Sequence, residues 1–225
     1  HVCGRAQRKE HRLRLRVDCQ GALNLADGRQ PITQTNPLAV RFIDQALQNP
    51  HNHAVLQRLP SLQLPDAWLV AGCLFQTVWN LQAGRDPTAG IKDYDLFYFD
   101  GADLTEQAEA AIGQRVDACF RDLGVTIEAK NQDRVHTWYP EWFGMPYAAL
   151  HSSREGIARF LVPCTCVGLQ PAAAATAPHL YAPYGLDELY CGILRPNPLM
   201  DHRELFRQKA ASYRDRWHWL QIRED

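Results

Sequence analysis

Two acids separated by one residue, Asp93 and Asp95, have the types and spacing that most clearly suggest chemistry in this sequence. They fall within Ile91–Phe99, a run of mostly aromatic and aliphatic residues that predicts a largely buried strand. Side chains two residues apart on a strand share one face, so the two carboxylates are held side by side. Their repulsion and burial cost free energy unless a cation lies between them, and carboxylate oxygens suit Mg²⁺ or Mn²⁺.

A third acid and a glycine turn lie on the elements predicted next to the strand that bears Asp93 and Asp95. Glu128 lies on the next predicted strand, 125–130, where it can complete a divalent-metal site or act as a general base. Gly72 and Cys73 stand where the predicted strand 67–71 turns into a helix. A small residue there lets the backbone approach a phosphate, and the helix N-terminus supplies free N–H groups. Each feature alone is also an ordinary structural device, so it is their combination that indicates phosphoryl transfer.

Polar and aromatic residues beside these elements are candidates for holding a nucleotide. Arg134 could contact a triphosphate, Trp138 could stack on a base and His136 could assist proton transfer. An equally good interpretation is a hydrogen-bonded cluster that fixes the strand pair. Lys92 could reach a phosphate, although its alternation with Asp93 favours a solvated side chain. The candidate nucleotide-binding residues are Gly72, Cys73, Gln76, Lys92, Asn131, Arg134, His136 and Trp138, and the candidate catalytic and metal-binding residues are Asp93, Asp95 and Glu128.

The elements that must position these residues alternate between helices and strands. Periodicity and turn signals predict strands at 67–71, 91–99, 125–130, 134–139 and 164–169. They predict helices at 38–48, 54–59, 74–81, 103–123, 152–160, 186–190 and 201–216, with Pro50 ending the first and capping boxes at Asp103/Glu106, Ser152/Glu155 and Asp201/Glu204. This order favours an α/β or α+β fold, a mixed sheet flanked by helices.

Composition and charge indicate an ordinary globular protein. Hydrophobic residues make up 46% of the 225 residues, enough for a sizeable core, and a net charge of −1 does not favour a long nucleic acid as partner. Seven cysteines without a CxxC pair, and the lack of a signal peptide or long apolar run, favour reduced thiols, a cytoplasmic location and no membrane contact. Residues 1–17 hold six Lys/Arg against one acid, so we expect a basic, poorly ordered arm at 1–30 and one domain at 31–225.

The glycine turn and the three acids together resemble the polymerase-β-like nucleotidyltransferase superfamily. Its pattern is a strand ending in a Gly-Gly or Gly-Ser turn, a helix, a strand bearing D-x-D or D-x-E, and a third acid on a later strand. The matching pieces here are Ala71-Gly72-Cys73, Asp93-Tyr94-Asp95 and Glu128, with Cys73 where the superfamily usually has Ser or Gly. Segments 70–80, 90–100, 130–138 and 181–189 are further similar to a bacterial nucleotidyltransferase-like family of unassigned substrate.

This resemblance implies a fold, a reaction class and a cofactor. We expect a polymerase-β-like nucleotidyltransferase core with a C-terminal α+β extension within 31–225. The implied reaction moves a nucleoside monophosphate from an NTP to an unidentified small-molecule or protein acceptor, with Mg²⁺ or Mn²⁺ as cofactor. Two alternatives stay open: a non-catalytic nucleotide-binding or protein-interaction module that kept the fold, and a hydrolytic carboxylate pair of the glycosidase type.

Overall fold

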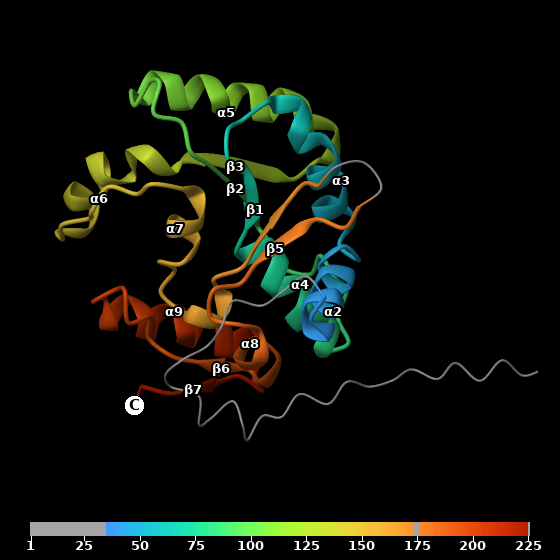
Figure 1. Ribbon diagram of the computed structural model, residues 1–225. Helices are drawn as coiled ribbons and strands as arrows, with labels where there is room; N and C mark the ends of the chain where they lie inside the picture. Colours follow the sequence, from blue (N-terminus) through green and yellow to red (C-terminus); the bar gives the residue numbers. More distant parts are fainter. Residues whose placement is uncertain (1–34, 173–175, 225) are drawn as a thin grey trace, which may run out of the picture.

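A five-stranded mixed sheet forms the centre of the computed structural model, which describes residues 35–172 and 176–224 (Figure 1). The strands follow the order β3-β2-β1-β4-β5. β2 and β3 are parallel, whereas the other three neighbouring pairs are antiparallel. Helices flank this sheet, so the predicted fold class is confirmed. The strands are β1 (Trp68–Val70), β2 (Asp93–Tyr98), β3 (Thr126–Asn131), β4 (Gly168–Gln170) and β5 (His179–Tyr181).

The main hydrophobic core lies between one face of the sheet and the helices that precede or follow β1 and β2. Tyr94, Leu96 and Tyr98 of β2 are buried there, as the alternation of a strand requires. Asn36 and Asn49 cap the first two helices through their side-chain oxygens. Pro50 begins the second helix, whereas the first ends at Ala46, before the position predicted from Pro50. The helices on this side are α2 (Pro37–Ala46), α3 (Pro50–Arg58), α4 (Gly72–Gln82) and α5 (Glu106–Phe120), with single 3-10 turns at η1 (Leu59–Leu62) and η2 (Arg121–Leu123).

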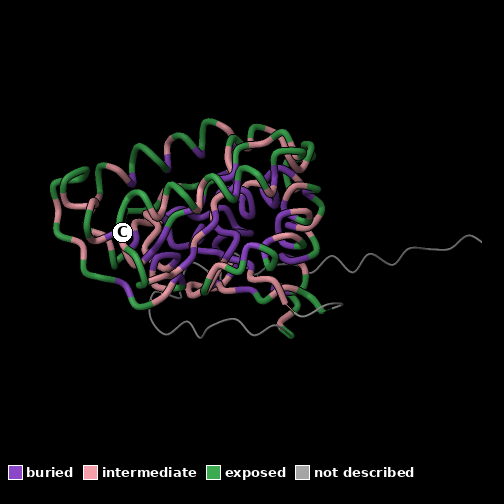
Figure 2. The backbone as a smooth tube through the Cα atoms, turned by 90° about the horizontal axis from the view of Figure 1, so that it is seen from above, coloured by how far each residue is buried: buried purple, intermediate pink, exposed green. Residues whose placement is uncertain are grey.

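The opposite face of the sheet is covered only in part. Trp68 and Val70 of β1 pack there against Ile157 of α7 (Ser153–Ile157). Beyond this contact lie η3 (Gln132–Arg134), α6 (Val135–Phe143) and α9 (Arg203–Arg216), on the side of the strands away from α2 and α3 (Figure 1). In the view from above, buried residues gather in the middle of the molecule and exposed ones surround them (Figure 2).

The C-terminal elements pack on α4. Trp79 donates a hydrogen bond from Nε1 to the Leu189 carbonyl oxygen (2.9 Å), and its ring lies 5.3 Å from the ring of Trp217. Trp217 in turn donates to Asn80 Oδ1 (3.2 Å). These contacts anchor α9 and its flanking chain to the helix that follows the glycine turn. The remaining elements are η4 (Pro163–Thr165), α8 (Asp187–Cys191), β6 (Ile193–Leu194) and β7 (Gln221–Ile222).

One predicted element has the wrong type. The segment Arg134–Tyr139, predicted as a strand, forms the end of η3 and most of α6. Asn131 ends β3, because its side chain accepts a hydrogen bond from the Asp133 N–H and turns the chain. The β-favouring residues after it are spaced so that positions four apart, such as Trp138 and Trp142, share a helix face. Similarly, the predicted strand 164–169 is a 3-10 turn followed by β4.

Helix starts test the three predicted capping boxes. At Ser152 the helix start is confirmed, since its Oγ accepts from the Glu155 N–H (3.3 Å), although the Glu155 carboxylate accepts from the His151 N–H (3.0 Å) and not from that of Ser152. At Asp103 it is wrong, because Thr105 caps α5 and accepts from the Ala108 N–H. At Asp201/Glu204 it is also wrong, because His202 precedes α9 without a side-chain cap.

Three further predictions concern reduced thiols, the absence of membrane contact and a basic arm at 1–30. Within the described residues no helix is long and apolar enough to span a membrane. The predicted arm, residues 1–30, lies outside the described part of the chain. Cys191 is disulfide-bonded, so the prediction of reduced thiols is wrong there, whereas four other cysteines of the described part of the chain, Cys73, Cys119, Cys164 and Cys166, form no disulfide.

Candidate functional site

The half-buried face of β2 carries the two predicted acids. Asp93, Asp95 and Phe97 alternate with the core residues and point away from the main core. Asp95 lies opposite Val70 on β1 and opposite Glu128 on β3. The strand alternation therefore brings the three predicted carboxylates to one face of the sheet. Glu128 is half-exposed there and forms an ion pair with Lys130 (3.7 Å).

Asp95 is the electrostatic centre of this face. Burial, together with the negative charges of Asp93 and Glu128, raises the pKa of the Asp95 carboxyl to about 6. Lys209 and Lys130 oppose this shift but do not cancel it. The raised pKa means that the ionised form of Asp95 is disfavoured where it lies, and a bound cation would stabilise that charged form.

The turn from β1 into α4 lies beside these acids. Ala71 precedes the helix with φ 53° and ψ −115°, a conformation that costs a non-glycine residue free energy. Gly72 follows, and a Cβ there would lie 3.0 Å from Nε2 of Gln76, so the side-chain amide lies directly over the glycine. Oε1 of Gln76 is buried without a hydrogen-bond partner. The turn thus places Gly72 and the buried, unsatisfied acceptor of Gln76 beside the acids.

Cys73 turns its side chain away from that space. The residue is fully buried, and Sγ donates to the Val70 carbonyl oxygen at 3.5 Å. Burial raises the pKa of the Cys73 thiol well above its ordinary value. Any contribution of Cys73 to a phosphate site must therefore come from its backbone N–H.

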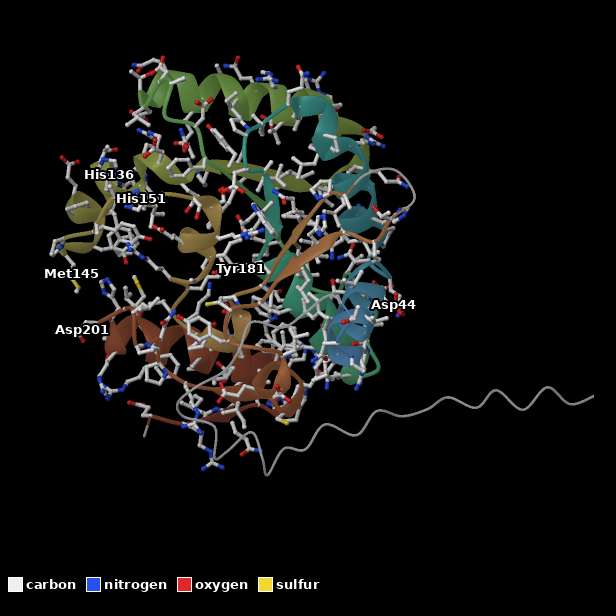
Figure 3. The ribbon with its side chains drawn as sticks, in the orientation of Figure 1. Asp44, His136, Met145, His151, Tyr181 and Asp201 are labelled. Carbon is white, nitrogen blue, oxygen red and sulfur yellow. The ribbon has the colours of Figure 1, made fainter. Side chains whose placement is uncertain are left out.

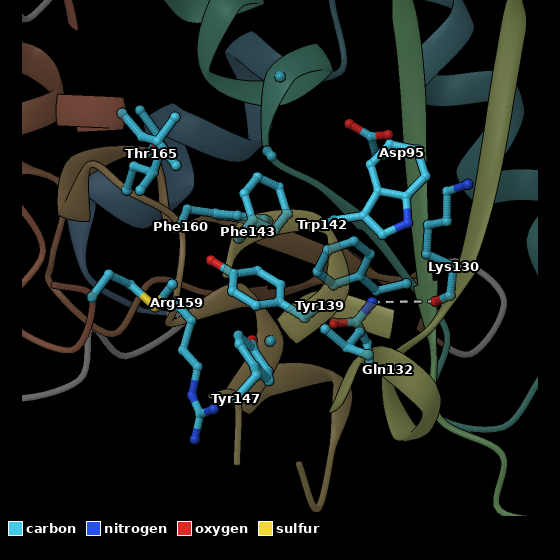
Figure 4. Close-up of a pocket in the computed structure, with 18 of the residues that line it drawn as sticks. Asp95, Lys130, Gln132, Tyr139, Trp142, Phe143, Tyr147, Arg159, Phe160 and Thr165 are labelled. Atoms are coloured by element: carbon cyan, nitrogen blue, oxygen red, sulfur yellow. Dashed lines mark hydrogen bonds between the residues drawn. The ribbon is translucent and has the colours of Figure 1, made fainter. Parts of the chain in front are cut away.

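A cavity of about 860 Å³ opens over Asp93 and Asp95, whereas Glu128 is not among its lining residues (Figure 4). The sheet contributes Asp93, Asp95, Phe97 and Lys130, and the glycine turn contributes Gly72 and Gln76. The opposite walls come from α6, α7 and α9. Figure 4 shows the aromatic side chains of Tyr139, Trp142, Phe143 and Tyr147 in the same cavity as Asp95 and Lys130. This volume lies within the range of small-molecule sites.

The structure divides the predicted nucleotide-binding residues into two groups. Those that line the cavity are Gly72, Gln76, Arg134 and Trp138. The others, Cys73, Lys92, Asn131 and His136, are not among its lining residues. Lys92 is exposed, and Nδ1 of His136 is buried without a hydrogen-bond partner.

Arg134 and Asn131 have structural partners. Arg134 forms a short ion pair with Glu109 of α5, where both side chains are largely buried, and donates from Nε to the Leu104 carbonyl oxygen (3.2 Å). Asn131 donates to the Asp100 carbonyl oxygen (2.8 Å) and accepts from the Asp100 N–H (3.1 Å). The hydrogen-bonded cluster considered from the sequence therefore exists at these two residues, although Arg134 also faces the cavity.

Several cavity residues were not identified from the sequence. Lys209 comes from α9, and its positive charge acts on Asp95 from more than a hundred residues away in the chain. Arg159 follows α7, and its guanidinium lies over the Tyr147 ring at 4.9 Å. Gln132 is buried on η3 and donates to the Lys130 carbonyl oxygen (3.3 Å, Figure 4). No pattern in the sequence around these three residues indicates a binding site, because only the tertiary fold brings their separate elements together.

Asp93 and Asp95 have the right chemistry for a hard divalent cation. Their oxygens project from one face, and Asp95 has a raised pKa that a bound cation would reverse. Among the described residues, no group of three or more His, Cys, Asp and Glu side chains is arranged to hold a metal ion. The fit therefore rests on the β2 pair, with Glu128 as a neighbour of that pair.

Comparisons with known proteins agree with this geometry. A family model described as nucleotidyltransferase matches residues 57–222, which include the glycine turn, all three acids and the cavity walls. The chain belongs to this nucleotidyltransferase family. No curated protein sequence matches the chain.

Two solved structures are similar to this nucleotidyltransferase to different degrees. A structure described as revealing a CCA-adding enzyme head domain is 25% identical, with a TM-score of 0.69 over 83% of this chain and 96% of the other. A tRNA-processing enzyme in an apo form is 11% identical, with a TM-score of 0.44 over 86% of this chain and 46% of the other. The first similarity confirms the predicted nucleotidyltransferase fold.

Proposed function

We propose that this protein transfers a nucleoside monophosphate from an NTP to the hydroxyl group of a small-molecule or protein acceptor, in a reaction that depends on Mg²⁺ or Mn²⁺. The observation that carries the proposal is the carboxylate cluster at Asp93 and Asp95, which lies on the open face of the sheet at the base of a cavity. Family membership supports nucleotidyl transfer as the reaction class.

Asp93 and Asp95 are the proposed ligands of the divalent cation. When bound there, Mg²⁺ would neutralise charge on the triphosphate and on the transition state. The glycine turn supports phosphate binding, because Gly72 and Cys73 begin α4 and their N–H groups belong to the first turn of the helix. The amide of Gln76, which lies over Gly72, offers a further polar contact.

Glu128 is the proposed proton acceptor. The acceptor hydroxyl oxygen attacks the α-phosphorus, and the bond from the α-phosphorus to the oxygen that bridges to the β-phosphorus breaks. Pyrophosphate leaves with that oxygen, and the hydroxyl proton passes to the Glu128 carboxylate. Its half-exposed position opposite Asp95 supports this role, since a base must reach both the site and the incoming acceptor.

Pyrophosphate release with each NTP and Mg²⁺ or Mn²⁺, measured across a panel of hydroxyl acceptors, tests the proposal. Wild-type protein should release pyrophosphate, and Asp93→Asn or Asp95→Asn should lower the rate by about 100-fold or more. Asp117→Asn, which neutralises an exposed acid on α5, is the matched control and should keep the wild-type rate. Unchanged turnover in Asp95→Asn would overturn the proposal.

The alternatives predict different results in the same assay. A non-catalytic nucleotide-binding module would bind an NTP with Mg²⁺ but release no pyrophosphate with any acceptor. A glycosidase-type pair would show no metal-dependent NTP binding at all. Membership of the nucleotidyltransferase family favours the catalytic interpretation over both.

A further inference from the structure

The wall of the cavity formed by α6 is unusually aromatic. Trp138, Tyr139, Trp142 and Phe143 occur within this one helix, and all four line the cavity together with Tyr147 from the chain that follows. Residues four apart on a helix share a face, so these side chains form two adjacent stripes, Trp138 with Trp142 and Tyr139 with Phe143.

The Tyr139/Phe143 stripe has structural partners. The Tyr139 ring lies 4.5 Å from that of Phe143 and 4.4 Å from that of Tyr147. Tyr139 Oη also lies 3.0 Å from His202 Nε2, at the start of α9. In Figure 3, Met145, two residues after α6, and Asp201, two residues before α9, lie near one another at the left of the view. This stripe therefore holds α6 against its neighbours.

Trp142 has no such role. Its side chain is 78% exposed although it belongs to the cavity wall, and among the described residues no ring contact involves it. An exposed tryptophan leaves a large apolar face in water, and that face gains most from a flat aromatic partner. The fold thus holds α6 in place with one stripe and leaves the indole of the other uncovered.

We infer that Trp142 stacks on the base of the nucleotide, with Trp138 behind it, and so favours purine over pyrimidine nucleotides. The inference rests on the proposed function, since the triphosphate must lie at Asp93 and Asp95. Continuity supports this occupant, because the acids, Lys130 and Trp142 line one cavity. Every base has a π-face that can stack on an aromatic side chain, and the larger purine face gains more.

The test compares ATP, UTP and inorganic triphosphate by titration calorimetry with Mg²⁺. Inorganic triphosphate keeps the phosphates and lacks the base, so it reports on the acidic end of the cavity alone. Wild-type protein should bind ATP more tightly than UTP and UTP more tightly than triphosphate. Trp142→Ala should weaken ATP binding by about 10-fold or more and leave triphosphate binding unchanged.

Two further variants control for the change in side chain. Trp142→Phe keeps an aromatic face and should retain most of the ATP affinity. Val40→Ala shortens an exposed apolar residue on a different helix, α2, and should behave as wild type.

The outcomes separate this inference from the function on which it rests. If wild-type protein binds neither ATP nor triphosphate with Mg²⁺, the proposed function fails and the base site fails with it. If both ligands bind but Trp142→Ala leaves ATP affinity intact, only the base site is overturned, and Trp142 serves the acceptor or a partner protein instead. An equal loss of ATP and triphosphate affinity in Trp142→Ala would also overturn it.

Discussion

The two faces of β2 differ in what covers them. Tyr94, Leu96 and Tyr98 face helices and are almost fully buried, whereas Asp93 and Asp95 on the alternate positions face a cavity. The covered face contributes to stability through apolar burial. On the open face, burial of Asp95 and the negative charges of Asp93 and Glu128 raise the pKa of Asp95 to about 6. One face of this short strand therefore stabilises the fold and the other destabilises it. It follows that Asp93 and Asp95 are kept in position by the hydrophobic core behind the strand and not by favourable contacts between the carboxylates themselves.

Removing a core side chain from the covered face should have the largest effect on stability. Leu96→Ala should lower the free energy of unfolding by about 4 kcal/mol, because the buried side chain leaves a cavity behind two acids. Urea denaturation followed by circular dichroism measures this value. A loss below roughly 1 kcal/mol would show that the covered face does not stabilise the strand in the way described here.

The ion pair between Arg134 and Glu109 should come next. Arg134→Met should cost about 3 kcal/mol, since it leaves the largely buried Glu109 carboxylate without its cationic partner and with only the hydrogen bond from the Asn131 N–H. Combining it with Glu109→Gln should recover much of that loss, which urea denaturation of the single and double variants can measure. Additive losses in the double variant would indicate that the two side chains do not interact, and would restore a purely ligand-binding role for Arg134.

Neutralising the open face should stabilise the metal-free protein. The pKa of Asp95 is about 6 in the fold, above the value near 3.9 of an unfolded chain, so the folded state binds more protons between these values. The free energy of unfolding should therefore fall as the pH rises from about 4 to about 6. Asp95→Asn should remove that fall and gain about 2 kcal/mol at pH 7, but little at pH 4.

Urea denaturation in the presence of a chelator, at a series of pH values, checks this prediction. Asp117→Asn serves again as the control, and its pH dependence should follow that of the wild type. An Asp95→Asn variant that is less stable than wild type at pH 7 would contradict the account of a strained open face.

Replacing Lys209 should have the smallest effect of these changes on the open face of β2. Its positive charge lowers the Asp95 pKa from across the cavity, so Lys209→Met should raise that pKa further, by a small amount because the lysine is exposed. Carboxyl titration by NMR can follow the shift. A pKa that stays the same would mean that α9 does not act on the acids.

Local patterns were enough to predict the acids and their setting. Alternation along β2 put Asp93 and Asp95 on one face, and the following helix and strand returned the chain so that Glu128 lies opposite Asp95. Both features depend on near neighbours in the sequence, where periodicity is informative. The fold class followed from the same alternation of helices and strands.

The opposite wall of the site could not be predicted in this way. The segment after Asn131 has β-favouring residues, yet Asn131 turns the chain into η3 and α6, where packing against Tyr147 and His202 decides the structure. The positions of Lys209 and Arg159 depend on how α9 and α7 dock, which is a property of the whole fold. The turn at Gly72 and Cys73 was placed correctly from the sequence. The burial of the Cys73 side chain was not predicted, and because of it only the backbone of Cys73 can contact a phosphate.

The most direct test of the central claim is Mn²⁺ binding, measured by electron paramagnetic resonance in the presence of a non-hydrolysable ATP analogue. The wild type and the Asp117→Asn control should bind Mn²⁺ together with the nucleotide, while Asp93→Asn and Asp95→Asn should lose that binding. Equal Mn²⁺ binding by wild type and Asp95→Asn, or none by wild type, would contradict the assignment of the β2 carboxylates as the metal site.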